Sequence, residues 1–329
     1  MALTAAAIEG SSRPPPAREL PAFSAQTRLL VIAPHPDDET LAAGMLIQRV
    51  RAAGGAVQIL LLTAGDNNPW PQRWLERRLR IRGDDRKRWG LRRYGELKTA
   101  LQRLDVPPQS LQALGWPDLG MTDLLLTHLD AAVATLAGAV DAFEPGIIAL
   151  PSLADRHPDH SAAHVLIRLA LAGQAVLPYS LTYLIHGDAP AAGSIEVAGT
   201  HAQAGKKRHA LAAHASQTAL SGRRMRRLAG RPEHFDELPY AELGRVSAGA
   251  ATTLPWQPPA WLKSRLRLSV VDRSGAQTWR WSDAPLQRAD DGTYHLAWPA
   301  GARALPRFAR LACDLPTPWI FDHWGWREL

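Results

Sequence analysis

The sequence predicts an α/β fold: a Rossmann-like, mostly parallel sheet flanked by helices, followed by a small C-terminal β-rich extension. Three observations support this prediction. Apolar runs at 28–32 and 56–62 flank a segment of helix length, which is typical of a right-handed βαβ unit. Clusters of ionisable side chains directly follow two apolar runs, where open parallel sheets place their ligands. From residue 251 onward the composition shifts, and apolar and polar residues alternate between Ser-Gly and Asp-Gly turns.

The predicted elements of the α/β domain alternate between strands and helices. Strand 28–32 leads to a helix at 39–53, which ends at Gly54-Gly55, a favourable pair after a helix C-terminus. Strand 56–62 follows. Further strands are expected at 110–114, 146–150 and 180–186, and further helices at 97–104, 121–142, 161–172 and 206–216.

Composition divides the chain into three parts. Residues 1–27 contain three consecutive prolines and no apolar period, so we expect a flexible N-terminal arm. Residues 28–250 form the predicted α/β domain, and 251–329 form the β-rich extension, which begins with a Pro-rich linker. Eight of the twelve tryptophans lie in that extension, where we expect them to be buried in a small sheet; exposed tryptophans would instead stack on sugars or rest at a membrane interface.

Composition also limits the class of protein. No apolar run approaches the roughly 18 residues of a transmembrane helix, and residues 1–10 lack the pattern of a secretory signal. A single cysteine, Cys313, excludes an intrachain disulfide framework and a Cys-rich zinc site. We therefore expect a cytoplasmic protein.

The formal net charge of +7 is unevenly distributed. Between Arg73 and Arg93 lie ten Arg or Lys residues against three acids. Such a segment could attract an anionic substrate, a nucleic acid or a membrane surface, or it could simply be a solvated helix face. No recognised nucleic-acid-binding motif accompanies it, so a nucleic-acid partner is not expected.

Two short stretches carry the chemistry. Residues 33–39, Ala-Pro-His-Pro-Asp-Asp-Glu, follow the first apolar strand, and residues 155–160, Asp-Arg-His-Pro-Asp-His, follow the apolar run 147–151. So many ionisable groups beside buried strands are costly unless something neutralises them. A divalent metal ion would do so, and two His-Asp clusters after two strands predict a metal site at that edge of the sheet.

Both stretches resemble the motifs of the PIG-L/LmbE family of zinc-dependent N-deacetylases, with the resemblance covering residues 28–240. It implies an LmbE-like fold and an enzyme that removes the acetyl group from an N-acetylglucosamine-type sugar or glycoconjugate. It further implies that His35, Asp38 and His160 are the metal ligands and that Asp37 is the general base for a metal-activated water. Zinc suits these ligands, although Fe²⁺ or Co²⁺ would also fit.

The resemblance assigns supporting roles to two further residues. His157 would act as an imidazolium that stabilises the tetrahedral oxyanion, and Asp159 would orient and charge His157. Because Glu39 lies at the helix start, we expect it to bond backbone amides or to support the ligand loop.

Three residues are candidates for substrate binding. Asp66 lies in a Thr-x-Gly-acid loop and could contact sugar hydroxyls or simply cap a turn. Arg93 opens an Arg-x-x-Glu element and could bind a phosphate or carbonyl oxygen, or form a structural pair with Glu96. His186 ends the strand at 180–186 and could reach the rim of the site, or be an ordinary strand-end histidine.

Other functions remain open at this point. An amidase of the same fold could act on another acyl amide, such as a thiol conjugate or an antibiotic intermediate. A non-catalytic carbohydrate- or lipid-binding protein could use the Trp-rich extension and the basic segment, although such a protein has no reason to retain Asp37 beside Asp38. The expected partner is an amino-sugar small molecule or glycoconjugate, anionic if the basic segment contacts it. Peripheral membrane contact stays open, and the sequence does not determine the oligomeric state.

Overall fold

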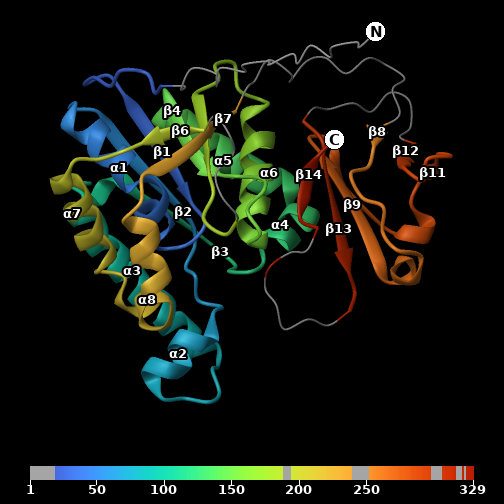
Figure 1. Cartoon of the computed structure of the whole chain (residues 1–329), viewed down its shortest axis with the longest axis horizontal. Coiled ribbons are helices and arrows are strands. Elements are labelled where there is room, and N and C mark those ends of the chain that lie inside the picture. The colour runs from blue at the N-terminus through green and yellow to red at the C-terminus, as the bar shows by residue number, and fades with distance from the viewer. Residues whose placement is uncertain (1–18, 188–193, 239–251, 298–305, 316–320, 322–323) are drawn as a thin grey trace, which may run out of the picture.

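The protein is described from a computed structural model, shown in Figure 1. The structure describes residues 19–187, 194–238, 252–297, 306–315, 321 and 324–329. A large α/β domain and a smaller unit of antiparallel strands lie side by side (Figure 1).

The α/β domain is built on a seven-stranded sheet in the order β3-β2-β1-β4-β5-β7-β6. The first five of these strands are parallel, and β7 and β6 add an antiparallel edge. The predicted α/β fold with a mostly parallel sheet is therefore confirmed. The strands are β1 (Arg28–Ala33), β2 (Ala56–Thr63), β3 (Leu111–Trp116), β4 (Ile147–Pro151), β5 (Tyr179–Tyr183), β6 (Ile195–Val197) and β7 (Glu233–Glu237).

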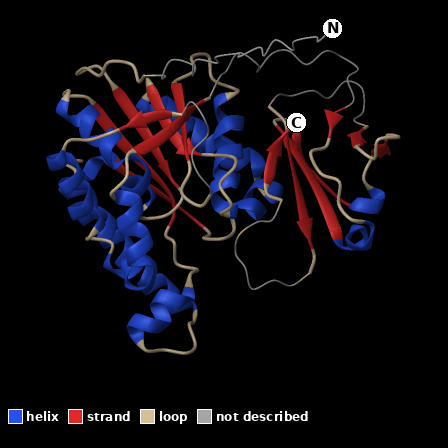
Figure 2. Cartoon of the chain, viewed as in Figure 1, coloured by secondary structure: helices blue, strands red, loops and turns tan. Residues whose placement is uncertain are grey.

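Helices cover both faces of this sheet (Figure 2). Side chains alternate along β1, so Leu29 and Val31 join one core cluster and Leu30 and Ile32 join the other. The first face is covered by α1 (Asp38–Ala52), α3 (Gly83–Arg103), α7 (His201–Leu211) and α8 (Ala215–Ala229), and the second by α4 (Met121–Thr127), α5 (Leu129–Phe143) and α6 (Pro158–Leu171). A short helix, α2 (Pro69–Glu76), packs against α8.

Two expected helices differ in the structure. The single helix expected at 121–142 is divided into α4 and α5, because His128 leaves the helical region with φ −136° and ψ 35°. The bend lets α4 and α5 both pack against α6. The helix expected at 206–216 is also divided: α7 ends at Leu211, and α8 begins at Ala215. Apolar spacing continues across the break at His128, so periodicity alone could not locate it.

The C-terminal region contains the antiparallel strands that the alternating pattern predicted. One sheet has the order β10-β9-β13-β14 and the other β11-β12-β8. These strands are β8 (Thr252–Thr253), β9 (Leu266–Asp272), β10 (Gly275–Arg280), β11 (Leu286–Arg288), β12 (Tyr294–Leu296), β13 (Phe308–Cys313) and β14 (Trp326–Glu328). Trp256, Trp281 and Trp326 are buried, whereas Trp261 is exposed.

The four-stranded sheet docks on the α/β domain. Val271, Phe308 and Trp326 belong to the same core cluster as the helices α4, α5 and α6. Arg168 of α6 forms two hydrogen bonds with Glu328 of β14, at 2.6 and 3.0 Å. Apolar burial and this bidentate pair therefore hold the extension against α6.

The expected domain limits stay predictions. Residues 1–18 of the proposed arm and residues 239–251, where the extension would begin, lie outside the described residues. Within the described part of the arm, Leu20 and Phe23 pack against the core, so this part is attached to the domain. No single described helix is long and apolar enough to cross a membrane; only the bent α4–α5 pair passes that test together, with 110° between its helices.

Candidate metal centre

The two predicted motifs meet at the point where the strand order reverses. β1 and β4 are neighbours in the sheet, and the chain leaves them toward helices on opposite faces, α1 and α6. A crevice forms at the carboxyl ends of such a strand pair, and ligands of open α/β sheets bind there. The loops 34–37 and 152–157 therefore face each other across this crevice.

The loop after β1 is held in a strained conformation. Asp37 has φ 119° and ψ −25°, in the left-handed region that side chains other than glycine rarely adopt. Its backbone N–H donates to Glu39 at 3.0 Å, and the Asp38 carboxylate accepts the N–H of His35 at 2.8 Å. Glu39 is in turn 3.3 Å from His214 Nε2. Glu39 thus bonds a backbone amide and supports this loop, as the sequence predicted.

The loop after β4 is organised by Asp155. Its carboxylate accepts the backbone N–H groups of His157, Ile185 and His186 at 2.9, 3.1 and 3.1 Å. The same carboxylate lies 3.0 Å from Nδ1 of His160. Because Nδ1 of His160 faces a carboxylate, its hydrogen belongs there and the lone pair of Nε2 is left free.

His35 is oriented in the corresponding way. Its Nε2 lies 3.2 Å from Asp118 and 3.2 Å from Asp159. Asp118 and Asp159 are themselves fixed by backbone amides, those of Asn67 at 2.6 Å and Leu119 at 2.7 Å. The hydrogen of the His35 ring therefore lies on Nε2, and its Nδ1 presents a lone pair.

Three donor atoms converge on one point. His35 Nδ1, Asp38 Oδ2 and His160 Nε2 are separated by 3.2–3.3 Å in each pair. A tetrahedral metal ion with ligand bonds of about 2.0–2.1 Å requires donor separations of about 3.3 Å. All three side chains are buried. Two neutral imidazoles and one carboxylate in this triangle fit a divalent metal ion.

Other combinations of these groups also lie close enough to share an ion. They are His35 with His157 and His160, His35 with Asp118 and Asp159, and Asp155 with His160 and His186. We favour His35, Asp38 and His160, because this set uses the ring nitrogens opposite to those held by the surrounding carboxylates, and because the Asp38 carboxylate lies 3.3 and 3.2 Å from them.

The electrostatics of the centre are dominated by buried carboxylates. Burial opposes protonation of His160, but the charges of Asp155 and Asp38 outweigh it and raise its pKa to about 10. Burial likewise opposes ionisation of Asp118, yet its hydrogen bond to His35 lowers its pKa to about 2. The site therefore attracts positive charge strongly, as a cation-binding site must.

Asp37 lies beside this triangle without being part of it. Burial raises the pKa of Asp37 to about 6, although the Arg93 guanidinium 3.5 Å away opposes the rise. Arg93 also donates to the carbonyl oxygens of Gly65 at 2.5 Å and Pro36 at 2.8 Å. A Cβ on Gly65 would lie 1.8 Å from the Arg93 Nη1, so glycine is required there for Arg93 to reach the loop.

His157 differs from its expected role in one respect. Its Nδ1 accepts the backbone N–H of Asp159 at 3.3 Å, which places the ring hydrogen on Nε2. Burial lowers the pKa of His157 well below its usual value, and His35 and His160 lower it further. A neutral ring with an Nε2–H is therefore favoured over an imidazolium. The Asp159 carboxylate, expected beside His157, contacts His35 instead.

The structure separates the three candidate substrate residues. His186 lines the cleft beside the centre, with its ring 3.4 Å from Asp155. Arg93 also lines the cleft, but its guanidinium is bonded to two backbone carbonyls, so it braces the loop after β1. Asp66 is not among the residues that line the cleft, whereas its neighbours Asn67 and Asn68 are. The alternative Arg93–Glu96 pair is not found among the described residues: Glu96 lies 3.3 Å from Arg92 and accepts two hydrogen bonds from Ser216.

Sequence reasoning did not assign a role to Asp118 or Asp155. Asp118 follows β3 in Gly-Trp-Pro-Asp, and Asp155 opens the second motif. Both positions follow a strand, which is the signal that could have found them. Their partners are far away in the sequence, so only the folded structure shows which histidine each one orients.

The centre opens into a cleft of about 470 Å³. Its walls come from α2, from α8 and from the C-terminal region, through Trp70, Leu220 and Phe321. Phe321 stands near His157 and His186, with ring centroids 6.2 and 5.6 Å away. Residue 321 therefore brings part of the C-terminal extension to the mouth of the cleft.

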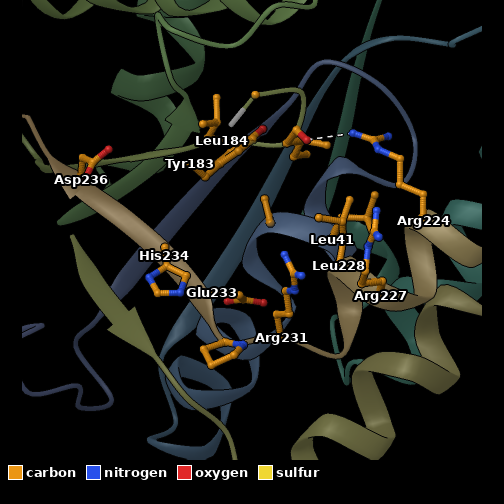
Figure 3. Close-up of a pocket in the computed structure, with 14 residues that line it drawn as sticks. Leu41, Tyr183, Leu184, Arg224, Arg227, Leu228, Arg231, Glu233, His234 and Asp236 are labelled. Carbon is orange, nitrogen blue, oxygen red and sulfur yellow. Dashed lines mark hydrogen bonds between the residues drawn. The ribbon is translucent and has the colours of Figure 1, made fainter. Parts of the chain in front are cut away.

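A second cavity of about 390 Å³ is lined by residues of α1, α8 and β7, among others (Figure 3). Figure 3 shows Arg224, Arg227 and Arg231 among these residues, together with Leu41 and Leu184. Arg224 lines both cavities and donates to the carbonyl of Ile185 at 2.9 Å. None of the converging donor atoms faces this second cavity, so the chemistry belongs to the first.

Comparison with known proteins agrees with this geometry. Residues 30–171 match the family described as PIG-L, GlcNAc-PI de-N-acetylase. That range contains both motifs and all three converging donors. The chain contains a PIG-L family domain.

A curated relative of the PIG-L domain is the 1D-myo-inositol 2-acetamido-2-deoxy-alpha-D-glucopyranoside deacetylase of Mycobacteroides abscessus. It is 34% identical over 157 residues, which are 44% of this chain and 55% of the relative. The chain thus spans about half the length of the curated relatives that it matches.

Solved structures share the fold of the PIG-L domain. The N,N'-diacetylchitobiose deacetylase from Pyrococcus horikoshii matches with a TM-score of 0.51 and 16% identity, over 65% of this chain and 84% of that one. A deacetylase triple mutant from the teicoplanin biosynthetic pathway matches with a TM-score of 0.51 and 18% identity, over 65% of this chain and 100% of that one. The unmatched part of this chain is about one third of its length.

Proposed function

We propose that this protein is a metal-dependent N-deacetylase that hydrolyses the acetamide of an N-acetylglucosamine-type sugar or glycoconjugate. The observation that carries the proposal is the triangle of His35 Nδ1, Asp38 Oδ2 and His160 Nε2, with separations of 3.2–3.3 Å, beside the unliganded carboxylate of Asp37. The 34% identical relative is named a deacetylase of an N-acetylated amino sugar linked to inositol, which supports this substrate class.

Zinc is the proposed metal, with Fe²⁺ or Co²⁺ as alternatives for the same ligands. When bound, the metal supplies a Lewis acid that polarises the acetyl carbonyl and makes water a stronger acid. The chain supports its binding by orienting both imidazoles: Asp155 fixes His160, and Asp118 and Asp159 fix His35. Such partners of metal ligands commonly raise metal affinity by about 10–100-fold.

Asp37 is the proposed general base. Its carboxylate faces the cleft next to the three donors. The left-handed backbone conformation of Asp37 and the nearby Arg93 guanidinium keep the carboxylate in this position. It would take the proton of the attacking water and return it to the nitrogen of the departing amine. Because one carboxylate performs both transfers, no second acid is needed.

His157 is the proposed donor to the oxyanion. Its Nδ1 is occupied by the backbone N–H of Asp159, so its Nε2–H is free to donate. The ring lines the cleft at a centroid distance of 4.6 Å from His35. A hydrogen bond from a fixed, neutral ring to developing negative charge stabilises the tetrahedral intermediate without reorganisation.

We also propose where the protein is located in the cell and which residues contact the sugar. The use of a single cysteine supports a cytoplasmic location. Of the three expected substrate residues, Arg93 and His186 line the cleft. The Arg93 guanidinium is bonded to backbone carbonyls, whereas the His186 ring is not. We propose that it contacts the sugar, together with Asn67 and Asn68.

The first experiment measures metal content. The wild-type protein, purified without added metal and then loaded with zinc, should hold about one equivalent. The variant Asp38→Ala with His160→Ala should hold none, whereas Asp37→Asn should keep the metal, since Asp37 is not a ligand. Zinc that binds equally to the wild type and the double variant would place the metal elsewhere.

The second experiment measures acetate release from N-acetylglucosamine, its inositol glycoside, diacetylchitobiose and an N-acyl glucosamine with a longer chain. Asp37→Asn should lower kcat by about 10²–10⁴-fold with metal retained. Asp236→Asn removes a carboxylate from the second cavity and serves as the matched control, with unchanged kcat. An Asp37→Asn enzyme with wild-type kcat would exclude Asp37 as the base.

A further inference from the structure

An exposed surface of tryptophan, leucine and arginine side chains extends from α2 into the turn that follows it. We call it the Trp-Arg surface and define it by Trp70, Trp74, Leu75, Leu79 and the basic residues 73–88. Trp74 is 68% exposed and Leu79 is 90% exposed. Figure 1 shows α2 and this turn projecting from the body of the α/β domain. Large apolar side chains that gather on a protruding element mark an interaction surface.

The packing of α2 explains why these side chains face outward. Asn68 caps the helix, and only Pro71 and Gln72 are buried within it. Gln72 donates to the backbone carbonyl of Asp85 at 2.7 Å and so ties α2 to the start of α3. The Gln72 contact and the packing of α2 against α8 therefore anchor the helix, and Trp70 and Trp74 remain mostly exposed.

The charges on this surface are mostly unneutralised. Arg78 and Arg88 pair with Asp85, and Arg88 also pairs with Glu76. Those acids are consequently used, and the described residues offer no carboxylate partner to Arg77, Arg80 or Lys87. Between Arg73 and Arg93 ten basic residues oppose three acids, an excess that equals the net charge of +7 for the whole chain.

We propose that the Trp-Arg surface docks on an anionic lipid bilayer. Tryptophan favours the interface between water and acyl chains, and arginines around it gain from the negative surface potential. A nucleic acid or an acidic protein would account for the arginines but not for Leu79, which is almost fully exposed among them. Arg73 lies over the Trp70 ring at 5.0 Å, an arrangement in which the ring enters the interface while the charge stays at the headgroups.

Docking in this way would direct the cleft at the membrane. Trp70 belongs to the Trp-Arg surface and also lines the cleft of the metal centre. A bilayer in contact with α2 would therefore lie at the cleft mouth, where a substrate with a lipid anchor could enter without leaving the membrane. The docking itself rests on the surface alone and does not depend on the proposed deacetylase activity.

The test is co-sedimentation of the full chain with phosphatidylcholine vesicles, with and without phosphatidylglycerol. We expect binding only to the vesicles that contain phosphatidylglycerol, a blue shift of tryptophan emission on binding, and weakening as salt is raised. The variant Arg77→Glu with Arg80→Glu should weaken binding by at least about tenfold, because each arginine near an anionic surface contributes about fivefold. The separate variant Trp74→Ser with Leu79→Ser should also weaken binding by at least about tenfold.

Matched controls come from the other end of the molecule. Trp261→Ser removes a tryptophan that is 75% exposed, and Arg288→Glu reverses an exposed charge, both in the C-terminal region. They should bind as the wild type does. All variants should show the wild-type circular dichroism and the wild-type rate on a water-soluble substrate, because none of these residues lines the cleft.

Three results would overturn the proposal. The wild type could fail to bind phosphatidylglycerol vesicles at low salt. The control variants could lose binding as much as the surface variants do. Finally, the serine variants could bind vesicles normally while the arginine variants lose binding to both vesicles and double-stranded DNA, which would make the surface a general polyanion site.

Discussion

The metal centre and the Trp-Arg surface use charge in opposite ways. In the centre the charged side chains are buried, and each is bonded to another charge or to backbone amides. On the Trp-Arg surface the charges are exposed, and several have no carboxylate partner among the described residues. Buried charges must be paired within the fold to be tolerated, so they fix geometry. Exposed charges cost little, so they remain available to a partner outside the chain.

Helix α6 shows how strongly a neighbouring charge changes the pKa of a buried histidine. His160 and His164 are both buried on this helix. Burial opposes protonation of both, but Asp155 and Asp38 raise the pKa of His160 to about 10. No carboxylate in the described part of the chain is paired with His164, and burial together with the charge of Arg168 lowers its pKa to about 3. Neighbouring charge, and not burial, decides the difference.

The largest expected change in the free energy of unfolding comes from removing a buried ion pair outside the metal centre. Lys207 is fully buried between Glu233 and the carbonyl oxygen of Leu41, at 2.5 and 2.8 Å. Gly44 leaves room for it, since a Cβ there would lie 3.1 Å from the lysine stem. Lys207→Met would leave the Glu233 carboxylate buried without its partner, so we expect unfolding to become easier by about 3–5 kcal/mol.

Chemical denaturation measures this effect. The double variant Lys207→Met with Glu233→Gln removes both charges and should lose distinctly less than the sum of the two single changes. A Lys207→Met protein as stable as the wild type would show that this buried pair is dispensable and would weaken the contrast between buried and exposed charge.

The next effect, about 2 kcal/mol, concerns His164. Its pKa of about 3 in the folded protein lies below the usual 6.5, so the unfolded chain binds a proton first as the pH falls. The contribution of His164 to stability is therefore full above pH 6.5 and is lost as the pH falls toward 3. At about pH 5 the free energy of unfolding of the wild type should be about 2 kcal/mol lower than at neutral pH, whereas His164→Met should not show this loss. Parallel stability curves for the two proteins between about pH 8 and pH 5 would contradict this.

The smallest effect compares two glycines with positive φ. Gly65 has φ +61° and a Cβ there would meet Arg93, whereas Gly115 has φ +67° and open space around it. Gly115→Ala should cost about 1 kcal/mol of backbone strain alone. Gly65→Ala should cost about 1 kcal/mol more and should also lower kcat, because displacing Arg93 releases the loop that carries Asp37.

Denaturation and acetate-release assays on the two alanine variants separate strain from displacement. Equal losses of stability and unchanged kcat in both would mean that Arg93 adjusts freely and does not brace the site.

Much of this fold could be predicted from the sequence. The strands β1, β2 and β4 are continuous apolar runs, and a strand buried on both faces requires such a run. The two motifs follow β1 and β4, so the location of the centre follows from the rule that parallel strands end at one edge. The alternating pattern after residue 251 likewise predicted antiparallel strands in the extension, and β9 and β13 are among them.

The remaining features depend on contacts between distant residues. The division of the helix at His128 reflects packing on α6, which no local pattern records. That Asp159 contacts His35, and that Asp155 contacts His160, follows from how two loops meet across the sheet. Exposure is equally non-local: the tryptophans of α2 and those of the extension look alike in sequence, yet Trp74 is exposed and Trp326 is buried.

The shared core between α6 and the C-terminal sheet has a consequence during synthesis. Phe308 and Trp326 cover the face formed by α4, α5 and α6, but they follow those helices far along the chain. The α/β domain therefore emerges from the ribosome before the residues that cover these helices, and the apolar side chains on the helices stay open to chaperones or to other nascent chains until residue 326 has emerged. Translation that stops before β14 would yield a protein with an intact metal centre and an apolar flank exposed to water.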